Sequence, residues 1–404
     1  MLLELLTSRP LFYFGPISHP YYDKYTHRAA VRIDAQMALP TIASIQDCAN
    51  FSLVVEPFLP QLRDLPYKLL DAVIAGDEAG GTIFYRLQDL YNQTNPLVSG
   101  FAASLLLAAG FLAVSELNQN FSQVDRLWSI LPNLYVMNFA VWARANGIPH
   151  ERIDLATLAT TFWSIRLTFN YWRKGGYKRG SEDYRWDIVR GYLPRAAFFL
   201  LNVTFISCIQ SILLFLFSGV PAYLIFLAGK IDVYIHGGDL AYFIICLALV
   251  GLEHIADGQQ WDYHQAKISY QVTAKVPKGY TQEELERGFI TRGLWKYVRH
   301  PNFVGEQLFW YTLYQWSCMA TQDHAWWAFT GSCLLILLFQ ASTALTETIT
   351  SSKYSEYKVY QNQVGMFFPL SAAGFNPPRP RGLENTQTGD LAKRTLEREA
   401  KKQE

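Results

Sequence analysis

Residues 299–306 read Arg-His-Pro-Asn-Phe-Val-Gly-Glu and combine side chains suited to cofactor binding with the start of a helix. The proline fixes φ at a value that suits helix initiation, so the residues before it approach unpaired backbone N–H groups that attract anions. Arg299 and His300 therefore predict an anion site that can hold a cofactor phosphate. Asn302 and Glu306 follow and can form hydrogen bonds with the same cofactor. In the competing interpretation, Arg299 and His300 only anchor the end of a membrane helix at the lipid headgroups.

A second set of polar side chains lies along an apolar segment that ends near residue 265. Glu253, Asp257 and Gln260 are spaced by four and three residues, so they share one helical face. A carboxylate at membrane depth costs about 2.5–3.5 kcal/mol, so it usually faces a cavity or a cation. We interpret this face as a contact with a polar cofactor. Alternatively, the last turns of this helix extend into water, which explains the polar side chain of Gln260 better than that of Glu253.

The apolar segment near 153–173 carries a matching polar face, which includes Trp163, Arg166 and Asn170. Snorkelling of the long arginine stem toward the headgroups explains Arg173 at the end of the segment better than it explains Arg166. We expect Arg166 and Asn170 to pair either with the acids of the other face or with a phosphate.

A group of tyrosines follows the last apolar segment. Tyr354 and Tyr357 are expected on one helical face, which Tyr360 continues. An interfacial aromatic belt explains this spacing, and the group can also line a cofactor base. Tyr354 and Tyr357 are therefore candidate cofactor contacts.

The elements that position these residues are expected to be membrane helices. The chain has 404 residues, of which 50% are hydrophobic and only 17% charged, whereas soluble domains carry about 25% charge. Apolar stretches of membrane-spanning length occur at 97–115, 127–145, 153–171, 196–218, 239–256, 304–321 and 325–345. A weaker stretch at 219–234 is predicted to be re-entrant or interfacial. The predicted fold class is all-α, a polytopic integral membrane bundle of about six or seven transmembrane helices.

Composition divides the chain into three parts. Residues 1–96 contain many turn formers and are predicted to be a peripheral N-terminal extension without a cleaved signal peptide. Residues 97–370 are predicted to form a membrane-embedded domain. Residues 371–404 are predicted to be a disordered cytosolic tail, because little in them is apolar. Lys401 and Lys402 resemble a dilysine retrieval signal, which predicts an endoplasmic reticulum membrane protein.

Basic residues predict the orientation in the membrane. The loops 172–195 and 267–299 are rich in lysine and arginine, so the positive-inside rule places both in the cytosol, together with the C-terminus. Within the second loop, Thr281 and Glu284 have the spacing of a capping box, and Gly288 is placed to end a short helix. This loop is therefore predicted to be folded, as a lid.

Several other function classes lack support. The net charge is +1 and the basic residues follow membrane sides, so nucleic acid is not an expected partner. The five cysteines show no paired spacing, so neither a disulfide framework nor a metal site is predicted. The chain lacks the motifs of soluble nucleotide folds, metalloproteases and α/β-hydrolases, so the bundle itself must bind any cofactor. The expected partners are the lipid bilayer and a lipophilic small-molecule substrate.

Six separated pieces of the sequence together resemble the steroid 5α-reductase-like membrane superfamily, specifically its branch called domain of unknown function 1295. The pieces are 125–132 (DRLWSILP), 163–167, 182–186 (EDYRW), 253–259 (EHIADGQ), 293–306 and 354–369. The resemblance covers roughly residues 97–370. It implies a helical membrane fold that holds NADPH near the cytosolic face and delivers a hydride to an activated C=C bond of a lipid.

The resemblance also implies roles for single residues. Asp257, Asn302 and Glu306 match polar cofactor contacts of the reductases, and the run Arg299 to Asn302 matches the sterol reductase signature. Phe303, however, stands where sterol reductases have tyrosine.

The substrate stays open, because no Glu and Tyr pair that polarises a steroid 3-keto group is found in the N-terminal half. Hydride transfer also requires a proton donor, for which Glu253 and Tyr171 are the candidates.

Two other functions fit parts of this pattern. Isoprenylcysteine carboxyl methyltransferases also use an R-H-P-x-Y-x-G segment that enters a membrane helix, so S-adenosylmethionine-dependent methyl transfer is the first alternative. The second is a non-enzymatic lipid-binding protein whose polar faces only stabilise the bundle. The pieces at 125–132, 182–186 and 253–259 favour the reductase.

Overall fold

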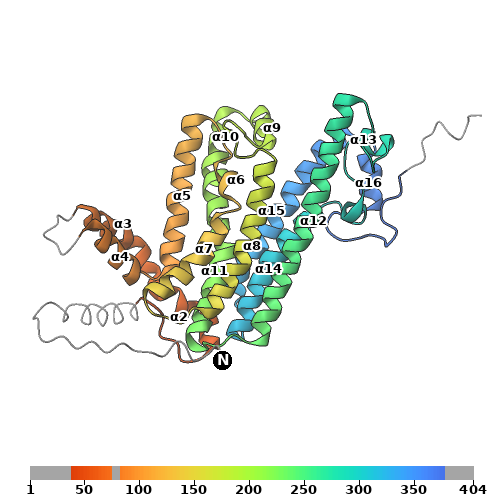
Figure 1. The fold of residues 1–404 in the computed structure, drawn as a ribbon. Coiled ribbons are helices and arrows are strands. Elements are labelled where there is room, and N and C mark those ends of the chain that lie inside the picture. Colours follow the sequence, from red (N-terminus) through yellow and green to blue (C-terminus); the bar gives the residue numbers. More distant parts are fainter. Residues whose placement is uncertain (1–37, 75–81, 378–404) are drawn as a thin grey trace, which may run out of the picture.

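The computed structural model describes residues 38–74 and 82–377, which form a bundle of helices (Figure 1). The long helices are α5 (Pro96–Asn118), α7 (Leu131–Ala145), α8 (Glu151–Arg173), α12 (Gly237–Thr273), α14 (Pro301–Thr321), α15 (Trp326–Lys353) and one continuous helix made of α10 (Arg195–Leu201), the π-helix η4 (Asn202–Ile209) and α11 (Gln210–Ile231). Among the described residues, four segments, 96–118, 195–231, 237–273 and 326–353, are long and apolar enough to cross a membrane. The predicted all-α membrane bundle is confirmed.

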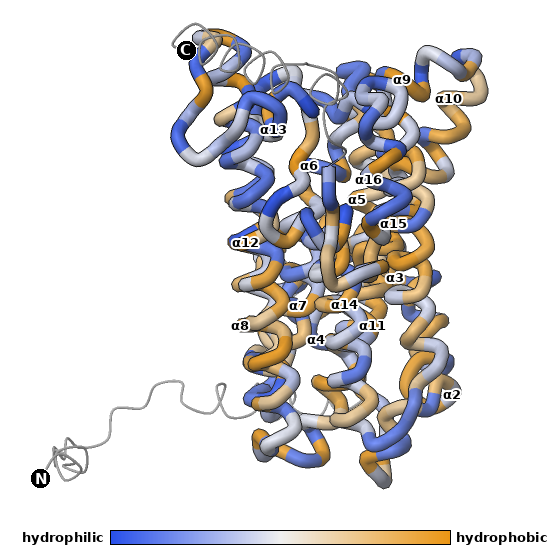
Figure 2. Tube along the Cα trace, turned by 90° about the vertical axis from the view of Figure 1, so that its right-hand side faces the viewer, coloured by the Kyte–Doolittle hydropathy of each residue, from blue (hydrophilic) through white to orange (hydrophobic). Residues whose placement is uncertain are grey.

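Shorter helices connect and extend this bundle. Before α5 they are η1 (Gln46–Ala49), α2 (Phe51–Val54), η2 (Glu56–Phe58), α3 (Leu59–Ile74) and α4 (Ile83–Gln93), and after it α6 (Gln123–Leu127), α9 (Tyr184–Tyr192), α13 (Gln282–Arg287), η5 (Gly293–Lys296) and α16 (Tyr357–Gln363). The two basic loops contain α9 and α13, and Figure 1 shows both of these helices at the same end of the molecule. Hydrophilic residues gather at that end, whereas hydrophobic residues cover much of the helix surfaces below it (Figure 2).

The stretch 219–234 is not a separate re-entrant or interfacial piece, and that prediction was wrong. Residues 219–231 continue the helix that begins at Arg195, and Pro221 lies within α11, which ends at Ile231. Residues Leu224 to Ala228 are almost completely buried, and α11 packs against α5, α7, α8, α14 and α15. A helix that is apolar on every side is stable when other helices surround it, so this stretch forms the centre of the bundle.

Local sequence signals set several helix ends as predicted. Pro301 occupies the first turn of α14, directly after His300 at the N-cap. The capping box of α13 is present in both directions between Thr281 and Glu284, and Gly288 ends the helix with φ of 86°. The loop is therefore folded, and its α13 packs on α12 through the Tyr263 hydroxyl, which donates to the Glu284 carbonyl at 2.9 Å.

The N-terminal region divides into two parts within the described residues. Residues 38–58 pack against the bundle: Trp327 donates to the Ala49 carbonyl at 2.9 Å, and Cys48 and Val54 are fully buried. In contrast, α3 and α4 project from the body beside α5 (Figure 1). Residues 1–37, to which the prediction of no cleaved signal peptide applies, lie outside the described part of the chain.

The packed structure extends past residue 370, where the predicted tail begins. The Phe375 amide donates to the Lys296 carbonyl at 2.8 Å, and the Phe375 ring is buried against Tyr360. Residues 378–404, including the two terminal lysines, lie outside the described residues.

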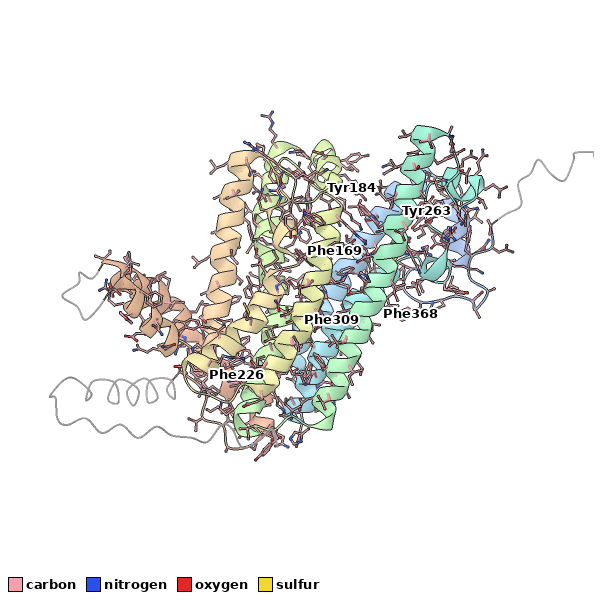
Figure 3. All side chains as sticks on the ribbon, in the orientation of Figure 1. Phe169, Tyr184, Phe226, Tyr263, Phe309 and Phe368 are labelled. Carbon is pink, nitrogen blue, oxygen red and sulfur yellow. The ribbon has the colours of Figure 1, made fainter. Side chains whose placement is uncertain are left out.

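Large aromatic rings fill the bundle interior beneath the polar end. Trp310 packs against Trp163 and Phe217 with ring centroids 4.7 and 4.6 Å apart, and all three rings are fully buried. Figure 3 shows Phe226 and Phe309 at successive levels of the bundle, with Phe169 and Tyr184 nearer the end that carries the basic loops. This buried aromatic layer lies directly beneath the polar residues of α8, α12 and α14 and packs against the helices that carry them.

Candidate functional site

A cavity of about 750 Å³ lies beside the polar residues of α8, α12 and α14. Its volume is within the range of about 300–1,000 Å³ that is usual for small-molecule and cofactor sites. One part of its lining is polar and comes mainly from α8, α12, α14 and the segments around α6 and α9; these residues are Asp125, Ser129, Arg166, Asn170, Lys174, Asp183, Arg185, Asp257, Asn302 and Glu306. The other part is mostly apolar and includes Val189, Leu193, Leu201, Phe205, Leu338, Phe339 and Leu345. A cavity with this division suits an amphipathic ligand.

Arg166 is the centre of a buried ionic cluster on the polar wall. Its Nη2 lies 2.7 Å from Glu253 Oε2 and 3.1 Å from Glu306 Oε2, and its Nη1 lies 2.9 Å from Asp257 Oδ2. All four side chains are buried. The predicted pairing of Arg166 with the acids of the 253–260 face is therefore confirmed. Because three helices contribute charges, the cluster also joins α8, α12 and α14.

Two indoles and an amide orient the acids of this cluster. Trp163 donates to Glu306 Oε2 at 2.9 Å and Trp310 donates to Glu306 Oε1 at 3.0 Å. Asn302 Nδ2 donates to Asp257 Oδ1 at 3.2 Å. Asn302 and Glu306 are four residues apart on α14, so the same helical face presents both to the cavity.

Gly305 allows α14 to approach α12 at the level of this cluster. A Cβ at position 305 would lie 2.4 Å from Cγ of Glu253, far inside contact distance. Glycine is therefore the residue that fits between the two helices here, and Glu253 is held against the α14 backbone.

The cluster carries an excess of negative charge. Three carboxylates surround one guanidinium, and a buried carboxylate without a compensating charge is strongly unfavourable. Within residues 38–74 and 82–377, Nε of Arg166, Oδ1 of Asn302 and Oε1 of Glu253 have no hydrogen-bond partner, whereas Oε2 of Glu253 is engaged in the ion pair with Arg166. The Arg166 N–H and the Asn302 oxygen, which line the cavity, can form hydrogen bonds with a ligand there, and the carboxylate of Glu253 can hold a proton.

The basic side of the cavity is formed at the end of α8. Lys174 donates to Gln260 Oε1 at 2.9 Å, and Arg173 Nε donates to Asn170 Oδ1 at 2.9 Å. Tyr171 lines the same region of the cavity. An anionic group of a ligand would meet Lys174 here.

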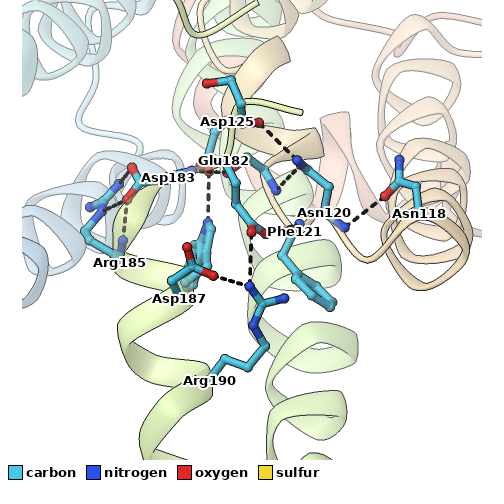
Figure 4. Close-up of polar contacts among 12 residues, drawn as sticks. Asn118, Asn120, Phe121, Asp125, Glu182, Asp183, Arg185, Asp187 and Arg190 are labelled. Atoms are coloured by element: carbon cyan, nitrogen blue, oxygen red, sulfur yellow. Dashed lines mark hydrogen bonds and ion pairs between the residues drawn. The ribbon is translucent and has the colours of Figure 1, made fainter. Parts of the chain in front are cut away.

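The sequence pieces 125–132 and 182–186 meet at another part of the cavity. Trp186 donates to Asp125 Oδ2 at 3.0 Å, while Arg185 pairs with Asp183 at 2.8 Å and donates to Ser342 Oγ at 2.7 Å. Burial raises the pKa of Asp125. Figure 4 shows this region, where Glu182 also accepts from the Phe121 amide. These contacts attach the loop before α9 to the body of the bundle and to α15.

Arg299 and His300 do not line the cavity. Both pair with Glu347 of α15: Arg299 through Nε to Oε1 at 2.6 Å and Nη2 to Oε2 at 2.9 Å, and His300 through Nε2 to Oε1 at 2.9 Å. Tyr357 donates to the same Oε1 at 3.2 Å and Gln361 donates to Oε2 at 2.9 Å. This Glu347 cluster is buried and joins α15, α16 and the start of α14. The candidate residues of the 299–306 segment thus divide between two clusters.

The three tyrosines after α15 do not share one helix, and this expectation was wrong. Helix α15 ends at Lys353, Tyr354 has an extended conformation, and α16 begins only at Tyr357. The rings of Tyr354, Tyr357 and Tyr360 instead pack around Phe289, with centroids 6.0, 4.9 and 5.4 Å away. The Tyr354 hydroxyl accepts from Lys267 at 2.9 Å. None of these rings lines the cavity described above.

Several polar residues line the cavity that the sequence interpretation did not assign to the site. They are Asp125, Ser129, Lys174, Asp183, Arg185, Gln210 and Ser342. Lys174 continues the face of Asn170 by four residues, which is a signal that periodicity alone could have used. Gln210 gave no such signal, because its orientation depends on the π-helix that precedes it.

Comparison with known proteins gives a family match. The family model described as "Protein of unknown function (DUF1295)" matches residues 111–364. The uncharacterized protein C594.04c of Schizosaccharomyces pombe is 38% identical over 333 residues, which cover 82% of this chain and 93% of the relative. No solved structure matches. The matched region contains the cavity, the Arg166 cluster and the Glu347 cluster.

Proposed function

This chain belongs to the DUF1295 family, and we propose that it is a membrane-bound NADPH-dependent reductase that acts on a C=C bond of a lipid or steroid-like substrate. The observation that carries the proposal is the Arg166 cluster, with its excess of carboxylates, on the polar wall of a cavity whose other wall is apolar. The apolar wall suits a lipid, and the polar wall suits a cofactor.

The polar residues of the cavity fit such a cofactor. Asn170, Asp257, Asn302 and Glu306 would bind its polar groups, and Lys174 would bind a phosphate. The unpartnered Oδ1 of Asn302 and Nε of Arg166, both among the described residues, support this assignment because a ligand could satisfy them.

The charge of the cluster favours hydride transfer. A reduced nicotinamide supplies a hydride when bound, and it becomes positively charged as the hydride leaves. The excess carboxylates of Asp257 and Glu306 stabilise a positive charge that develops in the cavity. A sulfonium group, in contrast, loses its positive charge during methyl transfer, so the same carboxylates would stabilise its ground state more than its transition state. The cluster therefore favours the reductase over the methyltransferase.

A proton must reach the substrate after the hydride. Tyr171 lines the cavity and is the residue that we place as donor. Glu253 lies behind the lining, and it shares Nη2 of Arg166 with Glu306. A proton held between these two carboxylates would reduce the charge excess and would be available to resupply the site. Glu253 is thus a positioning residue, which acts through Glu306.

The proposal also includes a location. We place the protein in the endoplasmic reticulum membrane, with the two basic loops and the C-terminus in the cytosol. The basic loops and the shared position of α9 and α13 at one end of the bundle support this orientation (Figure 1).

Ligand-induced thermal stabilisation of the purified, detergent-solubilised protein tests the cofactor. A ligand at about 100 times its Kd stabilises the folded state by about 2.7 kcal/mol. We expect NADPH to raise the unfolding temperature and S-adenosylmethionine to have little effect. An equal or larger shift with S-adenosylmethionine would overturn the reductase proposal, and no shift with either would favour a non-enzymatic lipid-binding protein.

Two alanine variants locate the binding site. Asn302→Ala removes a cavity residue and is expected to abolish the NADPH shift. His300→Ala changes a residue of the Glu347 cluster, so the unfolding temperature should fall while the NADPH shift is retained. Loss of the shift in His300→Ala alone would instead place the cofactor at the Glu347 cluster.

A further inference from the structure

Gln210 is a polar residue at the apolar side of the cavity. Its neighbours along the helix that also line the cavity are Leu201 and Phe205, and Leu338, Phe339 and Leu345 of α15 line it as well. Gln210 is only 5% exposed, and its Oε1 has no hydrogen-bond partner among the residues that the structure describes. A carboxamide in this position is a buried polar group that a cavity ligand can satisfy.

The π-helix η4 determines that Gln210 faces the cavity. The Gln210 amide donates to the Phe205 carbonyl, which is five residues back instead of four. In an α-helix, side chains four residues apart share a face, so a regular helix would place Ile209 rather than Gln210 above Phe205. Here Phe205 and Gln210 both line the cavity, while Ile209 is 50% exposed on the outside.

Buried polar contacts on the far side of the helix hold this wide turn in place. Asn202 Nδ2 donates to Ser115 Oγ at 2.9 Å and to Glu116 Oε1 at 2.6 Å, and Ser207 Oγ donates to Asn202 Oδ1 at 3.1 Å. Asn202 and Ser207 are buried against α5. The turn is therefore anchored to a neighbouring helix, and the orientation of Gln210 is part of the packed structure.

We propose that Gln210 binds a hydroxyl group of the lipid ligand at the apolar side of the cavity. A hydroxyl can donate to the carboxamide oxygen and can accept from its nitrogen, so it satisfies the side chain in either amide orientation. This inference rests on the proposed function and narrows its substrate class to lipids that carry a hydroxyl group within their apolar part or at its buried end. A purely hydrocarbon ligand leaves the amide unsatisfied.

The experiment compares two brominated probes that differ by one hydroxyl group, 9,10-dibromo-1-octadecanol and 9,10-dibromooctadecane. Bromine quenches tryptophan fluorescence at contact, and Trp128 and Trp186 line the cavity. The full chain is titrated in detergent micelles without NADPH. We expect the wild type to bind the alcohol about tenfold more tightly than the alkane, which equals about 1.4 kcal/mol.

Gln210→Leu is expected to abolish this preference, so that the two probes bind within about twofold of each other. Gln210→Glu retains an acceptor and should keep a preference for the alcohol. Ile209→Leu, in the same turn but on the outer face, is the matched control and should behave as the wild type. The tryptophan emission spectrum and the elution volume in detergent check that each variant is folded.

A preference for the alcohol that persists in Gln210→Leu would overturn the proposal, because another residue would then bind the hydroxyl. The absence of any preference in the wild type would overturn it as well. The probe titrations contain no NADPH, so they test Gln210 alone. A failure of NADPH to stabilise the protein, in contrast, contradicts the proposal that the protein is a reductase.

Discussion

Gly305 of α14 lies against Glu253 of α12, and its replacement by alanine tests how tightly the Arg166 cluster is packed. The added Cβ would lie 2.4 Å from Cγ and 3.2 Å from Cδ of Glu253, whereas ordinary carbon–carbon contacts are about 3.5–4.0 Å. The buried Glu253 side chain must therefore move by about 1 Å or more. Such a movement disrupts the 2.7 Å contact between its Oε2 and Nη2 of Arg166.

The expected loss of stability combines three effects. Overpacking of a buried site costs about 1–3 kcal/mol. The weakened ion pair adds less than the about 3–5 kcal/mol of a fully broken buried pair, because Arg166 keeps Asp257 and Glu306. Alanine in place of a helical glycine recovers up to about 1 kcal/mol. We therefore expect Gly305→Ala to lower the free energy of unfolding by about 2 kcal/mol.

Denaturant titration in detergent, followed by tryptophan fluorescence, measures this loss. Gly258→Ala is the matched control: it also lies in a helix of the bundle, but its added Cβ meets nothing within 4 Å, so stability should stay unchanged or rise. In a Glu253→Ala background the obstacle is gone, and Gly305→Ala should then cost less than about 0.5 kcal/mol. Equal effects of Gly305→Ala and Gly258→Ala, or an unchanged cost in the Glu253→Ala background, would refute the reasoning.

Three further changes test the charged groups separately. Arg166→Met leaves three buried acids without their cation, so we expect a loss of about 3–5 kcal/mol in the same titration, and a loss below about 1 kcal/mol would contradict the cluster. Glu347→Gln leaves Arg299 without its countercharge and should lower the unfolding temperature without changing the NADPH shift; loss of the shift would connect this cluster to the cofactor. Burial raises the pKa of Asp125 above 3.8, so the folded state binds the Asp125 proton more tightly than the unfolded state does. The contribution of Asp125 to the free energy of unfolding therefore falls as the pH rises from 3.8 through the raised pKa. Asp125→Asn should therefore gain stability relative to the wild type over that pH window, and a constant difference between the two proteins from about pH 4 to about pH 7 would oppose this view.

Features that depend on residues close together in the sequence were predictable from the sequence alone. The long apolar stretches became helices, Pro301 starts α14, and Thr281 and Glu284 form the capping box. The shared face of Glu253 and Asp257 also follows from helical periodicity, and it correctly indicated a buried cation partner. Hydrogen bonding and side-chain direction within one helix are local, so a single segment contains the information that these predictions need.

Features that depend on how helices pack were decided only by the tertiary structure. Arg299, His300 and Asn302 were all expected to contact one cofactor, but the packing of α15 brings Glu347 to Arg299 and His300 and leaves Asn302 at the cavity. The stretch 219–234 had the apolarity of either an interfacial or a central segment, and its neighbours on every side made it central.

The orientation of Gln210 depends on a π-turn that a buried network anchors to α5. Hydropathy and periodicity describe one helix at a time, whereas the identity of a charge partner or of a cavity wall depends on residues from several helices. The sequence alone therefore determined the membrane helices and their polar faces, and the tertiary structure determined which of these faces form one site.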